Sequence, residues 1–384
     1  MKNFVFHNPV KILFGKGQIA SIGDEIPENA RILVTYGGGS IKKNGTYEQV
    51  MNALDGFMVF EFGGIEPNPT YETLMKALPL IQQHQIDFLL AVGGGSVIDG
   101  TKFIAAAAHF EGDPWDILEK RAPVTAAIPL AAILTLPATG SEMNGSAVIS
   151  HTARHCKRYF TSPLVLPTFS VLDPEPTFSL PPRQIGNGIV DAFVHVMEQY
   201  LTYPANAPLQ DRMAEAILKT LIEEGPKTYQ QPHDYDARAN LMWCAVMALN
   251  GLIAAGVPED WTTHMIGHEI TALHGLDHAQ TLAIVLPAVM QIKARQKEAK
   301  LLQYADRVWN ICEGGTEQRI QAAIHKTREF FESIGVPTRL SAYQIDSDSV
   351  EAIPERLIAQ AMTKLGERED TDKPIVLKIL QAAL

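Results

Sequence analysis

Short apolar runs that end in glycine-rich turns dominate the first half of the chain. Lys11–Phe14, Arg31–Tyr36 and Ile86–Val92 have the length and apolar character of buried strands. The longest apolar run, Val124–Ala138, contains two prolines and two threonines. It is shorter than the roughly 20 residues of a membrane-spanning helix, so it predicts a further buried strand and no membrane segment. A helical pattern fills residues 71–85, and another follows the strand at 86–92. This alternation predicts an α/β domain with a parallel sheet.

The second half of the chain has helical periodicity in place of strand periodicity. Leu209–Glu224, Ala237–Leu252 and Thr316–Ile334 each carry apolar residues at helical spacing. Prolines cluster between residues 173 and 182, where they stop one element and open the next. The pattern therefore predicts two domains, an α/β domain at residues 1–180 and an all-helical domain at residues 181–384.

Two identical Gly-Gly-Gly-Ser turns follow predicted strands in the first domain, at residues 37–40 and 93–96. A glycine turn between a buried strand and a helix lets backbone N–H groups approach a phosphate. Two such turns in successive units favour a dinucleotide, although two tight strand–helix corners are the alternative. A segment rich in hydroxyl groups, residues 135–144, follows the longest apolar run. At the carboxyl end of a parallel strand it would line a ligand crevice.

Histidines gather in the stretch WTTHMIGHEITALHGLDHAQ, residues 261–280. His264 and His268 are four residues apart and share a helix face. His278 can approach them only if the helix breaks, and the His274–Asp277 segment offers a glycine C-cap and an aspartate N-cap. Upstream, Asp191 and His195 are also four residues apart.

One aspartate and three histidines suit Zn²⁺ or Fe²⁺, but spacing alone does not tell which histidines bind. Capped helix ends and buried structural histidines are the alternative explanation for the histidine cluster. A zinc protease is disfavoured, because Met265 stands where an H-E-x-x-H motif needs glutamate.

Composition and charge exclude several classes of protein. The 384 residues carry a formal net charge of −11 and no basic run, which argues against nucleic-acid binding and against an anionic membrane surface. The three cysteines form no C-x-x-C pair and indicate reduced thiols of a cytoplasmic protein. The N-terminal residues lack the apolar core of a secretory signal.

Several motifs in this order resemble the iron-containing alcohol dehydrogenase family, and most of all its NADPH-dependent aldehyde reductases and butanol dehydrogenases. They are VKILFGKG at 10–17, YGGGS at 36–40, AVGGGSVIDGTK at 91–102, LPATGSE at 136–142, VLDP at 171–174, VDAFVHVMEQY at 190–200 and HMIGHEITALHGLDHAQTLAIVLP at 264–287. The resemblance implies a nucleotide domain followed by a helical metal domain, as in dehydroquinate synthases. It also implies a homodimer.

The same resemblance assigns roles to particular residues. The family's metal ligands fall on Asp191, His195, His264 and His278, and its non-ligand histidine near the nicotinamide falls on His268. Cofactor contacts are expected at Gly37, Gly38, Gly39, Ser40, Asn68, Gly94, Gly95, Ser96, Asp99, Thr135, Thr139, Asn144 and Lys157. Lys102 is interpreted as a solvated helix residue, and the chain from about Asp306 onward offers no recognisable chemistry.

The implied activity is the reduction of small aldehydes with hydride from NADPH, aided by one divalent metal. His268 is the candidate proton relay, with a structural histidine as the alternative. Two other classes of protein remain open. One is a metal-dependent lyase or cyclase on the same scaffold, and the other is a non-catalytic nucleotide-binding protein.

Overall fold

The computed structural model describes the backbone of residues 1–384 and every side chain except those of residues 348 and 349. The chain forms two compact units. One comprises His7–Leu180 and Pro232–Val246, and the other comprises Met1–Phe6, Pro181–Gln231 and Met247–Leu384. The assignment of separate binding roles to residues 1–180 and 181–384 stays a prediction.

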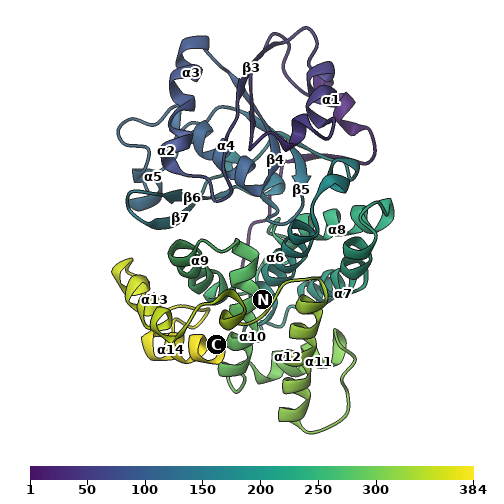
Figure 1. Cartoon of the computed structure of the whole chain (residues 1–384), viewed down its shortest axis with the longest axis vertical. Helices are drawn as coiled ribbons and strands as arrows, with labels where there is room; N and C mark the ends of the chain where they lie inside the picture. Colours follow the sequence, from purple (N-terminus) through teal and green to yellow (C-terminus); the bar gives the residue numbers. More distant parts are fainter. The chain divides into compact units, whose positions relative to one another are not determined.

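The first unit is organised around a six-stranded parallel sheet in the order β1-β8-β5-β4-β2-β3. The strands are β1 (Lys11–Phe14), β2 (Arg31–Tyr36), β3 (Met58–Phe62), β4 (Phe88–Gly94), β5 (Leu130–Leu136) and β8 (Phe169–Leu172). An antiparallel hairpin of β6 (Ser146–His151) and β7 (Cys156–Thr161) lies outside this sheet. Helices α1 (Thr46–Ala53), α4 (Gly95–Ala107) and α5 (Asp116–Glu119) connect the strands (Figure 1).

Burial of the central strands agrees with their apolar sequences. The side chains of residues 32–34 and 89–92 are almost completely inaccessible to solvent, as expected for strands covered on both faces of a parallel sheet. The pairing of β4 with β5 shifts register at Gly93 and Gly94, and α4 begins at the next residue. The second glycine turn therefore lies between a buried strand and a helix start, as the sequence predicts.

The predicted helix at residues 71–85 is wrong as one continuous element. The chain forms two pieces, α2 (Tyr71–Leu74) and α3 (Ala77–His84). Pro79 lies in the first turn of α3, where its missing N–H costs nothing, but it cannot continue a helix from α2. Thr70 caps α2 by accepting a hydrogen bond from the N–H of Thr73 at 3.3 Å.

The second unit is helical. Its helices are α6 (Pro182–Tyr200), α7 (Pro208–Gln230), α9 (Thr262–His274), α10 (His278–Ile292), α11 (Glu298–Arg307), α12 (Thr316–Ser333), α13 (Ser347–Ala359) and α14 (Lys373–Ala382), while most of α8 (Tyr235–Ala248) belongs to the first unit. The predicted fold class, a parallel α/β unit followed by helices, is confirmed. In the part of the chain that the structure describes, no helix has both the length and the apolar character that crossing a membrane requires.

Helix α6 is enclosed by its neighbours and carries buried residues on every side from Gly188 to Tyr200. It packs against α7 and α10. The polar residues of this stretch, Asp191, His195 and Glu198, are therefore held inside an apolar interior, where polar groups need partners.

The helix break in the histidine-rich stretch occurs where the sequence predicts it. Gly275 ends α9 in the left-handed conformation at φ 69°, and its N–H donates to the carbonyl of Thr271. Asp277 opens α10 with a capping box that it shares with Gln280. His278 thus becomes the first residue of a new helix that packs against α9.

Candidate functional site

The centre of the helical unit brings together the aspartate and the histidines singled out by the sequence. Asp191 and His195 lie one turn apart on α6, and Asp191 Oδ1 is 3.6 Å from His195 Nε2. His264 comes from α9, and its ring centroid lies 4.8 Å from that of His195. The ligand-type atoms of Asp191, His195 and His264 all lie within 4.8 Å of one another, and all three residues are buried.

His278 reaches the same group from the start of α10. Its Nε2 lies 3.9 Å from Asp191 Oδ1, and its ring centroid lies 5.2 Å from that of His264. The helix break at Gly275 thus places His278 beside the three buried residues as a fourth candidate ligand.

The distances suit a metal ion better than direct hydrogen bonds. Asp191 Oδ1 is buried and accepts no hydrogen bond from a described residue. The imidazole nitrogens at 3.6 and 3.9 Å are too far for such a bond. Two atoms that bind one tetrahedral ion at roughly 2.1 Å lie about 3.4 Å apart. The residues therefore fit a divalent cation, although their role as ligands stays a prediction.

Glu198 orients the histidine on α9. Its Oε1 accepts the backbone N–H of His264 at 2.9 Å and lies 3.2 Å from Nδ1 of the same ring. This contact favours Nε2 of His264 as the metal-facing atom, the arrangement in which a carboxylate fixes the ring of a ligating histidine. Burial, with the nearby charge of Asp260, raises the pKa of Glu198 to about 8, while the His264 N–H opposes this increase.

His268, the predicted proton relay, lies one turn beyond His264 on α9. Its ring centroid is 5.0 Å from that of His278 and 6.3 Å from that of His264. It is buried, but it is not one of the three residues whose ligand atoms gather most closely. The geometry puts His268 at the edge of the cluster, and its catalytic role stays a prediction.

In the α/β unit, the second glycine turn is closed by neighbouring side chains. A Cβ on Gly93 would lie 2.5 Å from a methyl group of Val97, and one on Gly95 would lie 2.4 Å from Thr139 Oγ1. Both positions exclude any larger residue without movement of the helix or of the 139–146 segment. The first turn differs, because a Cβ on Gly38 or Gly39 would meet nothing within 4 Å.

Three predicted cofactor residues from separate segments meet near the second turn. Ser96 Oγ accepts the N–H of Asn68 at 3.3 Å, and Lys157 Nζ donates to Asn68 Oδ1 at 2.9 Å. Asn68 has a positive φ of 56°, which asparagine tolerates better than most residues. The structure thus joins the start of α4, the loop before α2 and strand β7 in one polar group.

Other predicted cofactor residues shape the 139–146 segment. Asp99 accepts hydrogen bonds from Ser141 Oγ at 2.5 Å and from the N–H of Val148 at 2.9 Å. Thr139 Oγ1 accepts the N–H of Ser141, and the Asn144 amide donates to the carbonyl of Gly140. These side chains organise the protein, and direct contacts to a cofactor stay a prediction for them, as for Thr135 and Gly94.

Lys102 is not a solvated helix residue, so that interpretation is wrong. Its side chain is completely buried, and Nζ donates to Ser141 Oγ, to the carbonyl oxygens of Asn144 and Ser146 and to Asn144 Oδ1, at 2.8–3.2 Å. Lys102 thus holds the 139–146 segment against α4. The apolar character of α4 on all sides was the signal in the sequence, because such a helix has no solvated face.

Glu142, in the same segment, was not singled out by the sequence. Its side chain is fully buried, and neither carboxyl oxygen accepts a hydrogen bond from any other described residue. Burial raises its pKa to about 7, while its own backbone N–H and the charge of Lys102 offset part of this increase. An ionised carboxylate in this position is therefore costly to the folded state.

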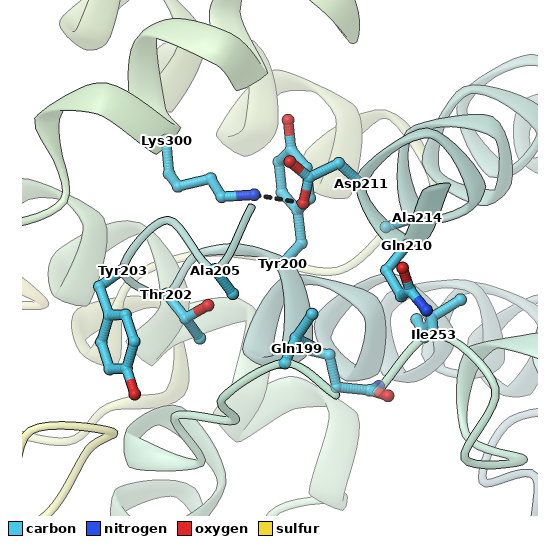
Figure 2. A pocket seen from close by; sticks show the side chains of 11 residues that line it. Gln199, Tyr200, Thr202, Tyr203, Ala205, Gln210, Asp211, Ala214, Ile253 and Lys300 are labelled. Carbon is cyan, nitrogen blue, oxygen red and sulfur yellow. Dashed lines mark hydrogen bonds and ion pairs between the residues drawn. The ribbon is translucent and has the colours of Figure 1, made fainter. Parts of the chain in front are cut away.

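Figure 2 shows a small cavity of the helical unit, and the candidate metal ligands Asp191, His195, His264 and His278 are not among the residues that line it. Its lining includes Gln199, whose amide nitrogen donates to the carbonyl oxygens of His195 and Ala248, and an ion pair between Lys300 and Asp211. Its volume is about 10 Å³, the room that one water molecule requires. This cavity is too small to hold an aldehyde.

Comparisons with known proteins define the class. Residues 9–174 match the family model described as iron-containing alcohol dehydrogenase, and residues 186–384 match that of the Fe-containing alcohol dehydrogenase family, C-terminal. The chain belongs to the iron-containing alcohol dehydrogenase family. This membership favours the oxidoreductase interpretation over the lyase and the non-catalytic nucleotide-binding protein.

Individual relatives match over their whole length. The chain is 58% identical to the NADPH-dependent aldehyde reductase YqhD of Escherichia coli, and the alignment covers 100% of both chains. It is 41% identical to the probable NADH-dependent butanol dehydrogenase 1 of Bacillus subtilis, with 100% of both covered. A crystal structure of YqhD superposes with a TM-score of 0.99, covering 100% of this chain and 99% of YqhD. The NADH-dependent butanol dehydrogenase A of Thermotoga maritima, 36% identical, superposes at 0.96 with the same coverage.

The first prediction separates ligands from neighbours in the histidine cluster. His264→Ala removes a candidate ligand and is expected to abolish stoichiometric binding of a divalent metal together with activity. His268→Ala, one turn away on the same helix, is the matched control and is expected to keep the metal while turnover falls. Elemental analysis and steady-state kinetics on both variants test this. Full metal content in His264→Ala would contradict the assignment.

A second prediction concerns Glu142 and pH. A carboxyl whose pKa rises from 4.5 in the unfolded chain to about 7 in the folded one favours folding fully below pH 4.5, and this contribution is lost as pH rises through 7. Glu142→Gln is therefore expected to be more stable than wild type above pH 7, by about 2–3 kcal/mol. Denaturant unfolding at pH 5 and pH 8 measures the difference. The exposed Glu48→Gln serves as control, and parallel pH profiles for wild type and Glu142→Gln would refute the expectation.

Proposed function

We propose that this protein reduces small aldehydes to alcohols with NADPH, and that it also catalyses the reverse oxidation. The observation that supports this most strongly is a buried Asp191–His195–His264 group in a chain 58% identical, over its full length, to an NADPH-dependent aldehyde reductase. Residues 1–180 are proposed to bind the dinucleotide, and residues 181–384 the metal.

The chain's own residues account for the parts of this reaction. A divalent cation, when bound, would polarise the carbonyl oxygen of an aldehyde to which NADPH supplies hydride. Asp191, His195, His264 and His278 are proposed to hold that cation, and Glu198 keeps the ring of His264 oriented. His268 is proposed to deliver the proton to the alcohol oxygen, because imidazole titrates near neutral pH.

Three finer features belong to the same proposal. The donor set of one carboxylate and three imidazoles accepts both zinc and iron, and either ion is consistent with it. The protein is proposed to be a cytoplasmic homodimer. Reduced thiols at Cys156, Cys244 and Cys312 agree with that location, since these three described residues form no disulfide.

An aldehyde panel tests the activity. Metal-analysed protein is expected to consume NADPH in stoichiometric amounts with aldehydes of about the size of butanal. Their kcat/KM should exceed that of phosphorylated sugars, because the sequence shows no cluster of basic residues near the metal segments. Equal or better efficiency with sugar phosphates would overturn the proposed substrate class, and an absence of NADPH consumption would overturn the activity.

The choice of NADPH over NADH is proposed to depend on the first glycine turn. Gly39 has φ 89° and open space around it, so a 2′-phosphate beside this turn would meet neither a side chain nor a like charge there. Two lysines, Lys42 and Lys43, lie near this turn in the sequence, and Lys42 already forms an ion pair. Its Nζ lies 2.9 Å from Glu61 Oε2 and stacks over the rings of Tyr36 and Tyr47 at 4.8 and 4.5 Å.

Gly39→Asp is expected to lower kcat/KM for NADPH by roughly tenfold to more than a hundredfold, because a carboxylate there repels the 2′-phosphate. The efficiency with NADH should be unchanged or higher. Gly39→Asn has the same size without the charge and is the control, with a much smaller expected loss. An unaltered NADPH/NADH ratio in Gly39→Asp would show that this turn does not contact the ribose.

A further inference from the structure

A buried lysine in the helical unit joins segments that are far apart in the sequence. Lys297, just before α11, places Nζ 2.6 Å from Asp260 Oδ2, 3.0 and 3.1 Å from the two carboxyl oxygens of Glu367, and 2.5 Å from the carbonyl oxygen of Leu201. The side chains of Lys297, Asp260 and Glu367 are only 2–3% exposed. Three ionisable groups buried together are costly unless each is well paired, so their arrangement is tightly constrained.

The charges within this cluster are unevenly shared. Burial alone would raise the pKa of Asp260, but its hydrogen bond with Glu367 and the charge of Lys297 lower that pKa. Burial and the adjacent Asp260 raise the pKa of Glu367. The cluster therefore favours an ionised Asp260 paired with an ionised Lys297, with Glu367 hydrogen-bonded to Asp260.

Asp260 connects the cluster to the start of α9. Its Oδ1 accepts the N–H of Thr262 at 2.8 Å, and its own N–H donates to the carbonyl of Glu198 at 2.9 Å. The intervening Trp261 has φ 61°, an unfavourable conformation for a bulky residue that persists only where its surroundings enforce it. Three residues after Trp261 comes His264, the candidate ligand on α9.

The lysine also contacts the helix that carries the other ligands. Leu201, whose carbonyl accepts from Lys297, follows the last residue of α6, the helix of Asp191, His195 and Glu198. Lys297 thus binds both the end of α6, through Leu201, and the segment before α9, through Asp260. Through Glu367 it also binds the loop between α13 and α14. The ammonium group thus binds the residue that follows α6 and a residue just before α9, the two helices that contribute to the Asp191–His195–His264 group.

We infer that Lys297 and Asp260 are positioning residues of the metal centre, which fix His264 relative to Asp191 and His195 without touching the metal. The inference rests on the proposed function, because it concerns the metal of that site. A residue that holds a ligand in place typically changes metal affinity tenfold to a hundredfold when it is replaced, whereas a purely structural ion pair changes only stability.

The chain offers a matched control for this experiment one turn earlier. Lys293 is also buried and also pairs with the loop between α13 and α14, at 2.6 Å from Asp370 Oδ1 and 3.1 Å from Thr371 Oγ1. The ammonium group of Lys293 pairs with these two residues and not with Asp260 or Leu201. Lys293→Met thus removes a buried lysine that pairs with the same loop, without releasing the start of α9.

The test measures Zn²⁺ affinity by chelator competition, the visible spectrum of the Co²⁺-loaded protein and the melting temperature. Lys297→Met is expected to weaken Zn²⁺ binding by about 10- to 100-fold and to alter the Co²⁺ spectrum. Lys293→Met is expected to lower the melting temperature while keeping wild-type Zn²⁺ affinity and the wild-type Co²⁺ spectrum. Equal Zn²⁺ affinity in wild type and Lys297→Met, or equal weakening in both variants, would overturn the inference.

A gentler substitution keeps the test decisive if Lys297→Met does not fold. Asp260→Asn retains an oxygen to cap Thr262 but loses the ion pair with Lys297, and the same weakening of Zn²⁺ binding is expected. Unchanged affinity in Asp260→Asn would also overturn the inference. Wild-type protein that binds no divalent metal would instead contradict the proposed function, so the two failures are distinguishable.

Discussion

The helical unit depends on keeping a carboxylate and several imidazoles inside an apolar interior. Asp191 and His195 lie on a helix that is covered on every side, so water cannot satisfy them, and their neighbours on α9 and α10 must be directed toward the same point. The break at Gly275 makes this possible, because it lets a fourth candidate ligand enter as the first residue of a new helix. The fold is arranged so that these polar atoms face one another.

The α/β unit also gathers buried polar atoms around one point, and there a lysine occupies that point. Lys102 gathers four oxygens around one buried ammonium group and thereby shapes the 139–146 segment. In both units a buried ammonium group, Lys102 or Lys297, binds carbonyl oxygens of backbone that lies outside helices and strands or at their ends. Lys297 repeats the arrangement at the start of α9, where Trp261 has a strained conformation.

Local chemistry explains what could be predicted from the sequence. The glycine turn before α4, the buried strands and the break between α9 and α10 each depend on residues within a few positions of one another. The single helix predicted at residues 71–85 is wrong because Pro79 prevents α2 from continuing into α3, and this effect is also local. Strand β3, with only one fully buried residue, gave a weaker apolar signal than its neighbours.

Long-range pairing explains what could not be predicted. Asp260, Lys297 and Glu367 are separated by 37 and 70 residues, and each alone has the appearance of an ordinary surface charge. Glu142 likewise carries no local sign of its burial. The region after Asp306, in which the sequence indicated no chemistry, supplies Glu367 to the buried cluster.

The position of Glu367, 70 residues after Lys297 in the chain, has a consequence for biosynthesis. A ribosome releases the chain from its N-terminus, and α6 and α9 are available for packing long before residue 367 of 384 has been made. Until then Lys297 has one carboxylate partner instead of two, and the loop between α13 and α14 does not cover it. The enclosure of this lysine therefore awaits the synthesis of residue 367, and a chain that terminated before it would lack both α14 and the second carboxylate partner of Lys297.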